Sequence, residues 1–284
     1  MDKVIIYGVH EFVGFHLCKG FLEKGYCVTG IHFNMEDALF VEEKRLEVGR
    51  NANFVEKALQ DSDNLSEAES GPAIIIISLY DLLMTYKESA LTTKKVFANM
   101  VQSLNKQKQT KNQIVYLLPI QLITGSNDLN GIEDVKDFLK ETKRKDRSIQ
   151  LVYLPTIFGP WQPPSFLFQR LLLNQLNKIE EQIVIREWPF DAIFINDALD
   201  PMFETIQTGK PGSFLLESGI PESWKRCADF LKIDQSIKSE CESVDIKSDE
   251  QIVKLSLQNI TPYSESLTIQ REHISLLRDL EDES

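Results

Sequence analysis

Cysteine, histidine and long apolar runs are all scarce in this 284-residue sequence. The four cysteines form no CxxC pair and the four histidines show no HExxH spacing, so the sequence predicts free thiols and no metal site. The longest apolar runs, such as residues 73–77, have the length of a strand and are far too short to span a bilayer. No signal peptide is recognisable, which together with the free thiols predicts a cytoplasmic location.

Positive charge is also scarce. The chain has 31 Lys and Arg against 43 Asp and Glu, a formal net charge of −12, and a field of this sign repels nucleic-acid phosphates and anionic lipids. We therefore expect neither nucleic acid nor a membrane as a partner. Residues 234–284 hold 12 acidic and 5 basic residues, so more than half of the excess lies there. The densest basic cluster, residues 136–147, is interleaved with acids on a helix pattern, which indicates a solvated face.

The first 31 residues predict a strand, a turn, a helix and a second strand. Residues 4–7 form a β-rich apolar run that ends at Gly8. A helix pattern with one apolar face then runs to Gly25, a residue typical of helix C-termini, and residues 27–31 follow as the next strand. This order is a βαβ unit.

The alternation of strands and helices continues along the chain. Residues 73–78 form a β-branched run without polar alternation, as expected for a strand with both faces covered. Further strands are predicted at 53–55, 113–118 and 149–154, and helices at 37–46, 89–106 and 132–145. The predicted fold class is α/β, a doubly wound parallel Rossmann-like sheet.

The pattern changes after Gly159, where a loop rich in proline begins. Helices are predicted at 166–176 and 196–206, extended pieces at 183–185, 192–195 and 213–216, and a loop or mobile segment at 236–250. We therefore expect a Rossmann-like domain over residues 1–159, with strands returning from 183–216, and a small C-terminal α/β lobe formed by 160–182 and 217–284.

Four stretches of the sequence resemble motifs of one known family. They read VIIYGVHEFVG (4–14), LPTIFGP (154–160), FDAIFIND (190–197) and GSFLLESG (212–219). In this order they resemble the glycine turn and the LPNVYGP, RDFIYVDD and GVYNIGSG segments of the extended short-chain dehydrogenase/reductases, in the epimerase/dehydratase branch that acts on nucleotide sugars. The resemblance implies a sheet that binds NAD(P) and a C-terminal lobe of the substrate-binding type.

The resemblance also implies that the turn after the first strand faces the dinucleotide. In the family it reads G-x-x-G-x-x-G, where the first Gly permits the tight turn, the second admits the pyrophosphate and the third allows close packing. Gly8 and Gly14 keep the first and third, whereas Glu11 replaces the second. A side chain there fills the space of the pyrophosphate and brings negative charge to the helix N-terminus. We favour the interpretation that Glu11 satisfies the helix dipole in a protein without a dinucleotide.

Other positions that match the family's cofactor contacts differ as well. His32 stands where an acid normally holds the adenosine ribose, and Ala58 where an Asp lies near the adenine. Bulky residues begin at Ser78, where the family has small ones. The complete set of matching positions is Gly8, Glu11, Phe12, Val13, Gly14, His32, Ala58 and Ser78.

The family's catalytic group is a Tyr-x-x-x-Lys pair with a Ser or Thr after the fifth strand. The Lys lowers the Tyr pKa, and the Tyr acts as acid and base on a sugar hydroxyl or ketone. Here Lys136 matches the Lys, but Ile132 replaces the Tyr, and no hydroxyl follows the fifth predicted strand until Thr124. Lys136 is the single catalytic candidate, although a lysine alone is more typical of a protein surface.

Two smaller features carry weaker expectations. Asp191, Asn196 and Asp197 cluster in the sequence, and we expect Asn196 or Asp197 to cap the next helix. Trp161, among several prolines, either lines a pocket beneath the C-terminal lobe or plugs it.

Three functions compete. The first is a non-catalytic family member that binds a protein or small molecule, which the simultaneous replacements at cofactor and catalytic positions favour. The second is an active NAD(P)-dependent epimerase, dehydratase or reductase in which Tyr116, Thr124 or Tyr153 supplies the missing group. The third is a nucleotide-sensing regulator. Lysines on the two helices through which the family dimerises, 89–106 and 132–145, favour a monomer or a non-standard dimer.

Overall fold

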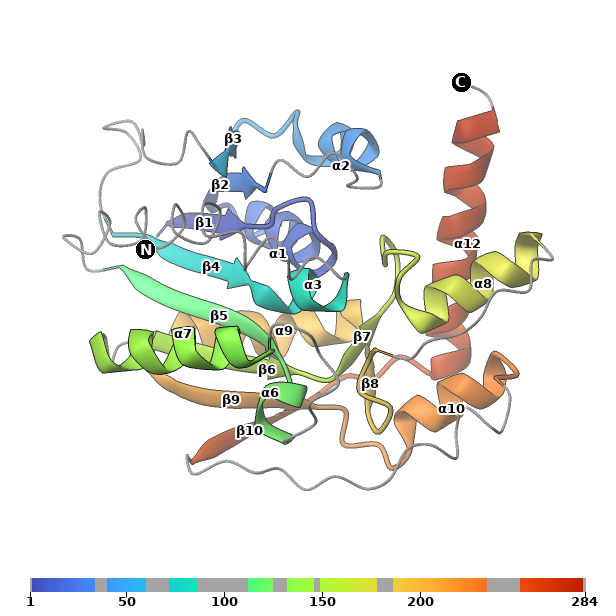
Figure 1. Cartoon of the computed structure of the whole chain (residues 1–284). Coiled ribbons are helices and arrows are strands. Elements are labelled where there is room, and N and C mark those ends of the chain that lie inside the picture. The colour runs from blue at the N-terminus through green and yellow to red at the C-terminus, as the bar shows by residue number, and fades with distance from the viewer. Residues whose placement is uncertain are drawn as a thin grey trace.

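Eight strands of the described chain form one parallel sheet (Figure 1). The computed structural model describes residues 2–33, 40–59, 72–85, 112–124, 132–145, 149–177, 186–233 and 251–282. The strands of the sheet are β1 (Lys3–Tyr7), β2 (Cys27–His32), β3 (Phe54–Ala58), β4 (Ile74–Ser78), β5 (Gln113–Pro119), β6 (Ile149–Leu154), β9 (Gly212–Glu217) and β10 (Ile252–Ser256). Their order is β10-β9-β6-β5-β4-β1-β2-β3. Two short strands, β7 (Thr156–Phe158) and β8 (Ala192–Phe194), pair separately.

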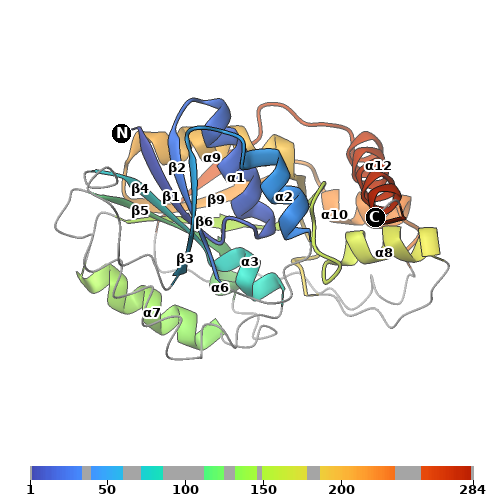
Figure 2. The same cartoon turned by 90° about the horizontal axis from the view of Figure 1, so that it is seen from above.

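Helices cover both faces of the sheet. They are α1 (Phe12–Glu23), α2 (Val41–Val48), α3 (Leu79–Met84), α6 (Gln121–Thr124), α7 (Ile132–Lys145), α8 (Leu167–Asn177), α9 (Ile195–Thr208), α10 (Ser223–Phe230) and α12 (Tyr263–Asp282). Figure 2 shows α1 and α9 on one side of the sheet and α7 on the other, while α8, α10 and α12 gather beside the sheet. Within the described ranges, no helix combines the length and the apolar character that crossing a membrane requires.

β1 and β4 are neighbouring inner strands of the sheet and are buried along almost their whole length. They pair in parallel from Val4↔Ile74 to Tyr7↔Ile77. Four successive isoleucines in β4 place branched apolar side chains on both faces, which suits a strand between two layers of helices. The predicted fold class, a doubly wound parallel α/β sheet, is confirmed.

Most predicted elements are present, with shifted ends. α7 and β6 begin and end as predicted, whereas β3 extends past the predicted 53–55 to Ala58. β10 and α12 were not predicted. β10 lies at the edge of the sheet with none of its residues fully buried, so it lacks the apolar run that marks a central strand. The predicted helix 89–106, strand 183–185 and segment 236–250 lie outside the described residues.

β10 belongs to the sheet, although it lies in the stretch 217–284 that the sequence placed in the C-terminal lobe. It pairs in parallel with β9 from Ile252↔Ser213 to Ser256↔Glu217. α10 and α12 of the same stretch pack together, and α12 also packs on α8 (Figure 1). The division into a sheet domain and a lobe stays a prediction, with β10 moved from the lobe to the sheet.

Hydrogen bonds among three buried glutamines connect α12 to the loop after β7 and to α8. Gln270 Nε2 donates to Gln162 Oε1 and to Gln169 Oε1, each at 2.7 Å. Gln162 Nε2 in turn donates to Ile157 O at 2.8 Å. Because all three side chains are buried, these bonds form in a medium of low dielectric, where they are strong and costly to break.

A glycine allows α1 and α9 to pack closely. A Cβ added to Gly20 would lie 2.2 Å from the ring of Phe203. Phe21 meets the same ring edge to face, with centroids 4.8 Å apart. Any side chain larger than hydrogen at residue 20 would therefore push the two helices apart.

We predict that Gly20→Ala lowers the free energy of unfolding by about 2–3 kcal/mol, because the added methyl overpacks the α1–α9 contact. Gly25→Ala is the matched control, since nothing lies within 4 Å of the Cβ that it adds and only its positive φ of 82° costs about 1 kcal/mol. Urea unfolding measures both, and Phe203→Leu should recover part of the loss in Gly20→Ala. Equal losses in the two glycine variants would contradict the close contact.

Candidate functional site

A carboxylate of the chain itself binds the N-terminus of α1. Asp81, in α3, accepts hydrogen bonds from Val13 N at 3.0 and 3.1 Å and from Gly14 N at 3.1 Å. Ser78 Oγ donates to the same carboxylate at 2.7 Å. The first amides of a helix have no acceptor within the helix, so Asp81 satisfies two of them from a site 68 residues away from Val13 along the chain.

The turn before α1 has the geometry that requires glycine at two positions. Gly8 has a φ of +86°, and its amide donates to Ile31 O at 2.8 Å. A Cβ on Gly14 would lie 2.1 Å from Gly8 O, so turn and helix touch through their backbones. Gly8 and Gly14 therefore serve the packing roles that the family resemblance implies for them.

Glu11 occupies the N-cap position of α1, but its side chain makes no capping hydrogen bond. Asp81, and not Glu11, is the hydrogen-bond acceptor of these amides, while the interpretation that the charge of Glu11 satisfies the helix dipole stays a prediction. Burial raises the pKa of Asp81 to about 6, and the charge of Glu11 adds to this rise, while hydrogen bonds from Ser78 and Val13 oppose it. Two carboxylates thus lie close together at this helix end.

The turn is covered by the chain itself. Every residue from Gly8 to Gly14 is buried, including Phe12 and Val13. The ring of Phe33 lies over Gly8, since a Cβ on this glycine would come within 3.0 Å of it. A pyrophosphate binds by close approach to this backbone and to the free amides of the helix. With the backbone covered and two amides taken by Asp81, the residues present do not fit a dinucleotide.

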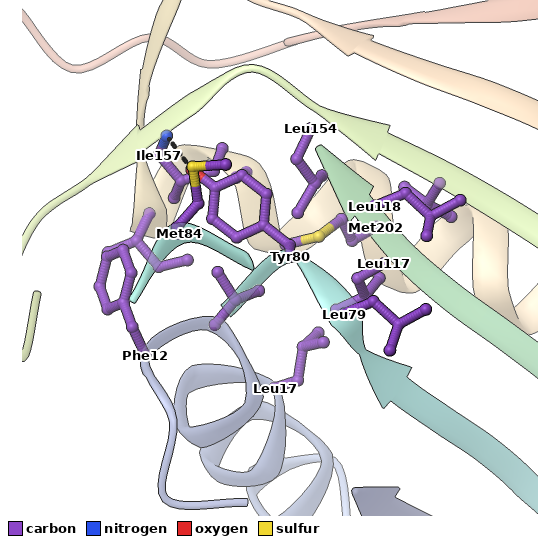
Figure 3. Close-up of a cluster of buried hydrophobic side chains, with 14 of the residues drawn as sticks. Phe12, Leu17, Leu79, Tyr80, Met84, Leu117, Leu118, Leu154, Ile157 and Met202 are labelled. Atoms are coloured by element: carbon purple, nitrogen blue, oxygen red, sulfur yellow. Dashed lines mark hydrogen bonds between the residues drawn. The ribbon is translucent and has the colours of Figure 1, made fainter. Parts of the chain in front are cut away.

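Tyr80 fills the space beside the end of β4. Its ring belongs to a buried cluster with Met84, Leu154 and other apolar side chains (Figure 3). Its hydroxyl accepts a hydrogen bond from Ile157 N at 3.0 Å, and burial raises the Tyr80 pKa well above its ordinary value. Ser78 ends β4 and caps α3. The bulky segment that starts at Ser78 therefore belongs to the core and to helix capping, not to the wall of an open cleft.

Charged side chains pair with one another at the ends of β2 and β3. His32 and Ala58 are register partners there, and His32 Nε2 lies 3.8 Å from Glu56 Oε1. Arg45 Nε donates to both carboxylate oxygens of Glu56 at 3.0 Å. His10 Nε2 lies 3.0 Å from Glu56 Oε1. Glu56, beside the predicted adenosine position at His32, thus has three cationic or imidazole groups of the chain within 4 Å of its carboxylate.

The electrostatics of this cluster follow from those contacts. Burial alone would raise the pKa of Glu56, but hydrogen bonds from Arg45 and His10 outweigh it and lower the pKa to about 2. Burial lowers the pKa of His10, although Glu56 opposes that effect. Glu56 is therefore ionised at neutral pH, and its carboxylate pairs with Arg45 and His10.

A buried lysine and a tryptophan connect α1, α2 and α12. Lys44 Nζ donates to His10 O at 2.8 Å and lies 5.6 Å from the ring centroid of Phe15 and 5.7 Å from that of Trp161. Trp161 packs edge to face on His273 of α12, with centroids 4.5 Å apart. The Trp161 side chain is buried in these contacts. Its position therefore favours the second predicted role, in which it fills the space beneath the C-terminal lobe, over lining a pocket there.

Two histidines lie beside Trp161 and its neighbour Pro160, His16 buried and His273 half-buried. His16 Nε2 donates to Pro160 O at 2.9 Å. Burial lowers the pKa of His16 to about 3 and that of His273 to about 4. The nearby charges of Lys19 and Lys44 lower both values further.

The catalytic candidate Lys136 lies on α7 and pairs with a neighbour. Its Nζ is 2.8 Å from Glu133 Oε1, and about a third of its side chain is exposed (32%). Ile132, at the position of the family's Tyr, is the first residue of α7. This exposed i, i+3 ion pair is typical of a helix surface.

The three alternative sources of a hydroxyl are all buried. Tyr116 lies in β5 and its ring meets Phe138 of α7 edge to face, with centroids 5.8 Å apart. Tyr153 lies within β6, where it pairs in register with Leu118. Thr124 ends α6, and its Oγ1 is 3.4 Å from Gln121 O. Their positions in packed elements favour structural roles.

The expected capping by Asn196 or Asp197 is wrong. α9 begins at Ile195 with Phe194 as its N-cap, so both residues lie inside the first turn. Asp197 instead accepts hydrogen bonds from Thr261 N at 2.8 Å and Thr261 Oγ1 at 2.7 Å, which tie α9 to the segment before α12. Asp191 accepts from Ser218 N at 2.9 Å and from Ser223 Oγ at 2.6 Å at the start of α10.

The described part of the chain contains no group of three or more His, Cys, Asp or Glu that could hold a metal ion. Cys18, Cys27 and Cys227 are free thiols, and burial raises the pKa of Cys18 and of Cys227 to about 12. The two buried thiols, Cys18 and Cys227, are therefore protonated at neutral pH and are poor nucleophiles.

Asp81 was not among the predicted site residues, although the sequence carries a partial signal for it. Ser78 and Asp81 form an S-x-x-D pattern, which marks a helix N-terminus, and Ser78 is indeed the N-cap of α3. That local signal locates the cap of α3. It does not reveal that the Asp81 carboxylate reaches the amides of α1, because this contact depends on the pairing of β1 with β4.

Solved structures of several other proteins have a similar fold. UDP-glucuronic acid 4-epimerase from Bacillus cereus, in complex with UDP-glucuronic acid and NAD, is similar with a TM-score of 0.68 and 16% identity, over 97% of this chain and 99% of that chain. The Bordetella bronchiseptica enzyme WbmH, in complex with NAD+, gives 0.67 and 16% over the same shares. dTDP-glucose 4,6-dehydratase from Bacillus anthracis, in complex with NAD, gives 0.61 and 10% over 97% of each chain.

The chain therefore has the fold of the extended short-chain dehydrogenase/reductases, and the resemblance drawn from the four sequence motifs is confirmed at the level of the fold. No model of a known protein family matches the sequence, and no curated protein matches it either.

We predict that the protein loses stability in acid through His16. The pKa of His16 is about 3 in the folded chain and about 6.5 when unfolded, so below pH 6.5 the unfolded state binds the proton and is favoured. The cost is about 1.4 kcal/mol for each pH unit between these values.

His16→Gln is the matched variant, because its amide can still donate to Pro160 O but does not titrate. Between pH 7 and pH 5, the wild type should lose about 2 kcal/mol more unfolding free energy than His16→Gln. Asp81 titrates with the opposite sign in both proteins, so its effect cancels in the difference. Parallel losses in the two proteins, measured by urea unfolding, would show that His16 is not buried in the neutral form.

Proposed function

We propose that this chain is a non-catalytic protein with the fold of the NAD-dependent epimerases and dehydratases, and that it acts by binding a protein or small molecule. One observation carries the proposal. The amides of Val13 and Gly14, at the helix end where this fold binds a pyrophosphate, donate to the carboxylate of Asp81.

Charge supports the same conclusion. A pyrophosphate entering this site would meet the carboxylates of Asp81 and Glu11, both buried. Like charges repel strongly when water is excluded. Phe33 covers Gly8 and Tyr80 is buried at the end of β4, so these described residues occupy space along the strand ends that a dinucleotide would need.

The adenosine end of the site supports it as well. In a dinucleotide-binding sheet, an acid at the end of the second strand accepts hydrogen bonds from the ribose. Here that position is His32, and the nearby carboxylate of Glu56 is bound to Arg45. No ribose contact of the family type is therefore available from these residues.

An active enzyme with substituted residues is the alternative. It would need a hydroxyl with a lowered pKa beside a cation. Lys136 pairs with Glu133, and the three candidate hydroxyls, on Tyr116, Thr124 and Tyr153, are buried in packed elements. A nucleotide-sensing regulator, the second alternative, would need an open phosphate site, and the buried turn from Gly8 to Gly14 argues against it.

We further propose a cytoplasmic location and a monomer or non-standard dimer. Three free cysteines in the described residues suit a reducing compartment. α7, one of the two helices through which this fold commonly dimerises, exposes Lys140 and Glu141 next to the Lys136–Glu133 pair, so a matching face on a second copy would bring like charges together.

We predict that neither NADH nor NADPH binds the protein at concentrations up to about 1 mM. Fluorescence transfer from the three tryptophans to the nicotinamide measures binding, with an NAD-dependent epimerase of the same fold as the positive control. Glu11→Gly alone should leave binding absent, because Asp81 still holds the amides. Micromolar binding to the wild type would overturn the proposal, and binding gained in Glu11→Gly would favour the nucleotide-sensing alternative.

We also predict no turnover of UDP- or dTDP-sugars with added NAD, and no difference between the wild type and Lys136→Ala. Lys136 is engaged in a surface ion pair, so its loss should change the free energy of unfolding by less than about 0.5 kcal/mol. Product formation followed by chromatography is the measurement. Turnover by the wild type that disappears in Lys136→Ala would establish the active-enzyme alternative.

A further inference from the structure

The two edges of the eight-stranded sheet differ in how well they are protected against a further strand. β3 and β10 lie at its two ends (Figure 1). A strand at a sheet edge presents amides and carbonyls to any chain that can pair with it, and charged side chains, prolines or bulges normally prevent this. The residues of β3 and β10 therefore indicate which edge can accept a partner.

β3 carries such protection. Glu56 and Lys57 are two of its five residues, and Arg45 of α2 bonds to the Glu56 carboxylate. Adjacent charged residues on so short an edge strand disfavour the addition of another strand.

β10 lacks this protection. Its sequence, IVKLS, holds neither proline nor glycine and a single charge, Lys254, and its pairing with β9 runs without a bulge from Ile252 to Ser256. Lys254 Nζ lies 2.8 Å from Glu217 Oε1 of β9, so this charge is neutralised within the sheet. Val253 beside it is 49% exposed. Among the described residues, β9 is the only strand that pairs with β10.

The pattern of β10 is complementary to itself. When two copies of one strand pair antiparallel about a two-fold axis, the residue on the axis faces its own copy. With Val253 on the axis, Ile252 lies opposite Lys254 of the second copy, and Gln251 lies opposite Leu255. No charge then faces a like charge, a placement that destabilises strand pairing. An axis at Lys254 would instead set two lysines opposite each other.

We propose that β10 is the self-association surface of this protein, at which a second copy of the chain adds its own β10 antiparallel about Val253 and continues the sheet across both molecules. This dimer goes beyond the proposed function and does not depend on it, because its contacts come from other residues than those of the turn after β1. Assembly stops at two copies, since the two-fold axis uses both β10 edges and leaves the charged β3 edges outside.

Sedimentation of the wild type from about 10 µM to about 500 µM tests this dimer. A pair of five-residue strands buries less surface than a stable complex does, so we expect weak association with a Kd of about 100 µM. Each copy carries a net charge of −12. Raising the salt from about 0.05 M to about 0.5 M should therefore strengthen association several-fold by screening the repulsion. A wild type that stays monomeric throughout, or grows past the dimer, would overturn the inference.

Val253→Lys should weaken this association at least about tenfold, because the two added lysines face each other on the axis. Val55→Lys is the matched control. Val55 is 47% exposed on β3, the opposite edge strand, and the variant changes the net charge equally, so it should associate like the wild type. Loss of association in both variants, or in neither, would contradict a dimer through β10.

Val253→Cys keeps the inference testable if Val253→Lys does not fold. Opposite Cα atoms of an antiparallel pair lie about 4.5–5.5 Å apart, within the range that a disulfide needs. Under mild oxidation, Val253→Cys should form a covalent dimer on a non-reducing gel. Val55→Cys and the wild type, whose Cys27 is exposed, should stay monomeric. No more dimer in Val253→Cys than in these two controls would overturn the inference.

Discussion

The contact between the Asp81 carboxylate and the amides of Val13 and Gly14 is the interaction on which the rest of this structure depends. It joins α1 to α3, the helices that follow the neighbouring inner strands β1 and β4. A helix end at this position must have an acceptor, because its first amides are buried. Supplying it from the chain allows the turn to be covered by Phe33 and the space beside β4 to be filled by Tyr80.

The same principle applies to the other charged groups along this edge of the sheet. Glu56 is bound by Arg45 and His10, and the ammonium of Lys44 is bound by the His10 carbonyl and the rings of Phe15 and Trp161. The charges of Glu56 and Lys44 are thus compensated by other groups of the chain, so neither residue needs a bound ligand to be stable at its position. The polar groups at the ends of β2 and β3 are therefore engaged by other side chains of the chain.

The sequence predicted the fold because its central strands are apolar on both faces and its motifs occur in a recognisable order. β4, with four isoleucines, and α7, with a clear polar face, were located closely for this reason. β10 and the role of Asp81 escaped prediction for physical causes. β10 is too exposed to show a pattern. The sequence could show that a carboxylate sits in the turn, but only the packing of α3 on α1 decides that Asp81 and not Glu11 binds the helix.

If the proposed function holds, these replacements mean that the chain is adapted to the absence of a dinucleotide and has not merely lost contacts to one. Loss of contacts alone would leave the first amides of α1 without an acceptor and the glycine turn open to solvent. Instead the amides have Asp81, the turn is buried, and α12 is fastened across Trp161 by His273 and by the Gln270 network. Within the part of the chain that the structure describes, the helix end after β1 is thus completed by the chain's own groups.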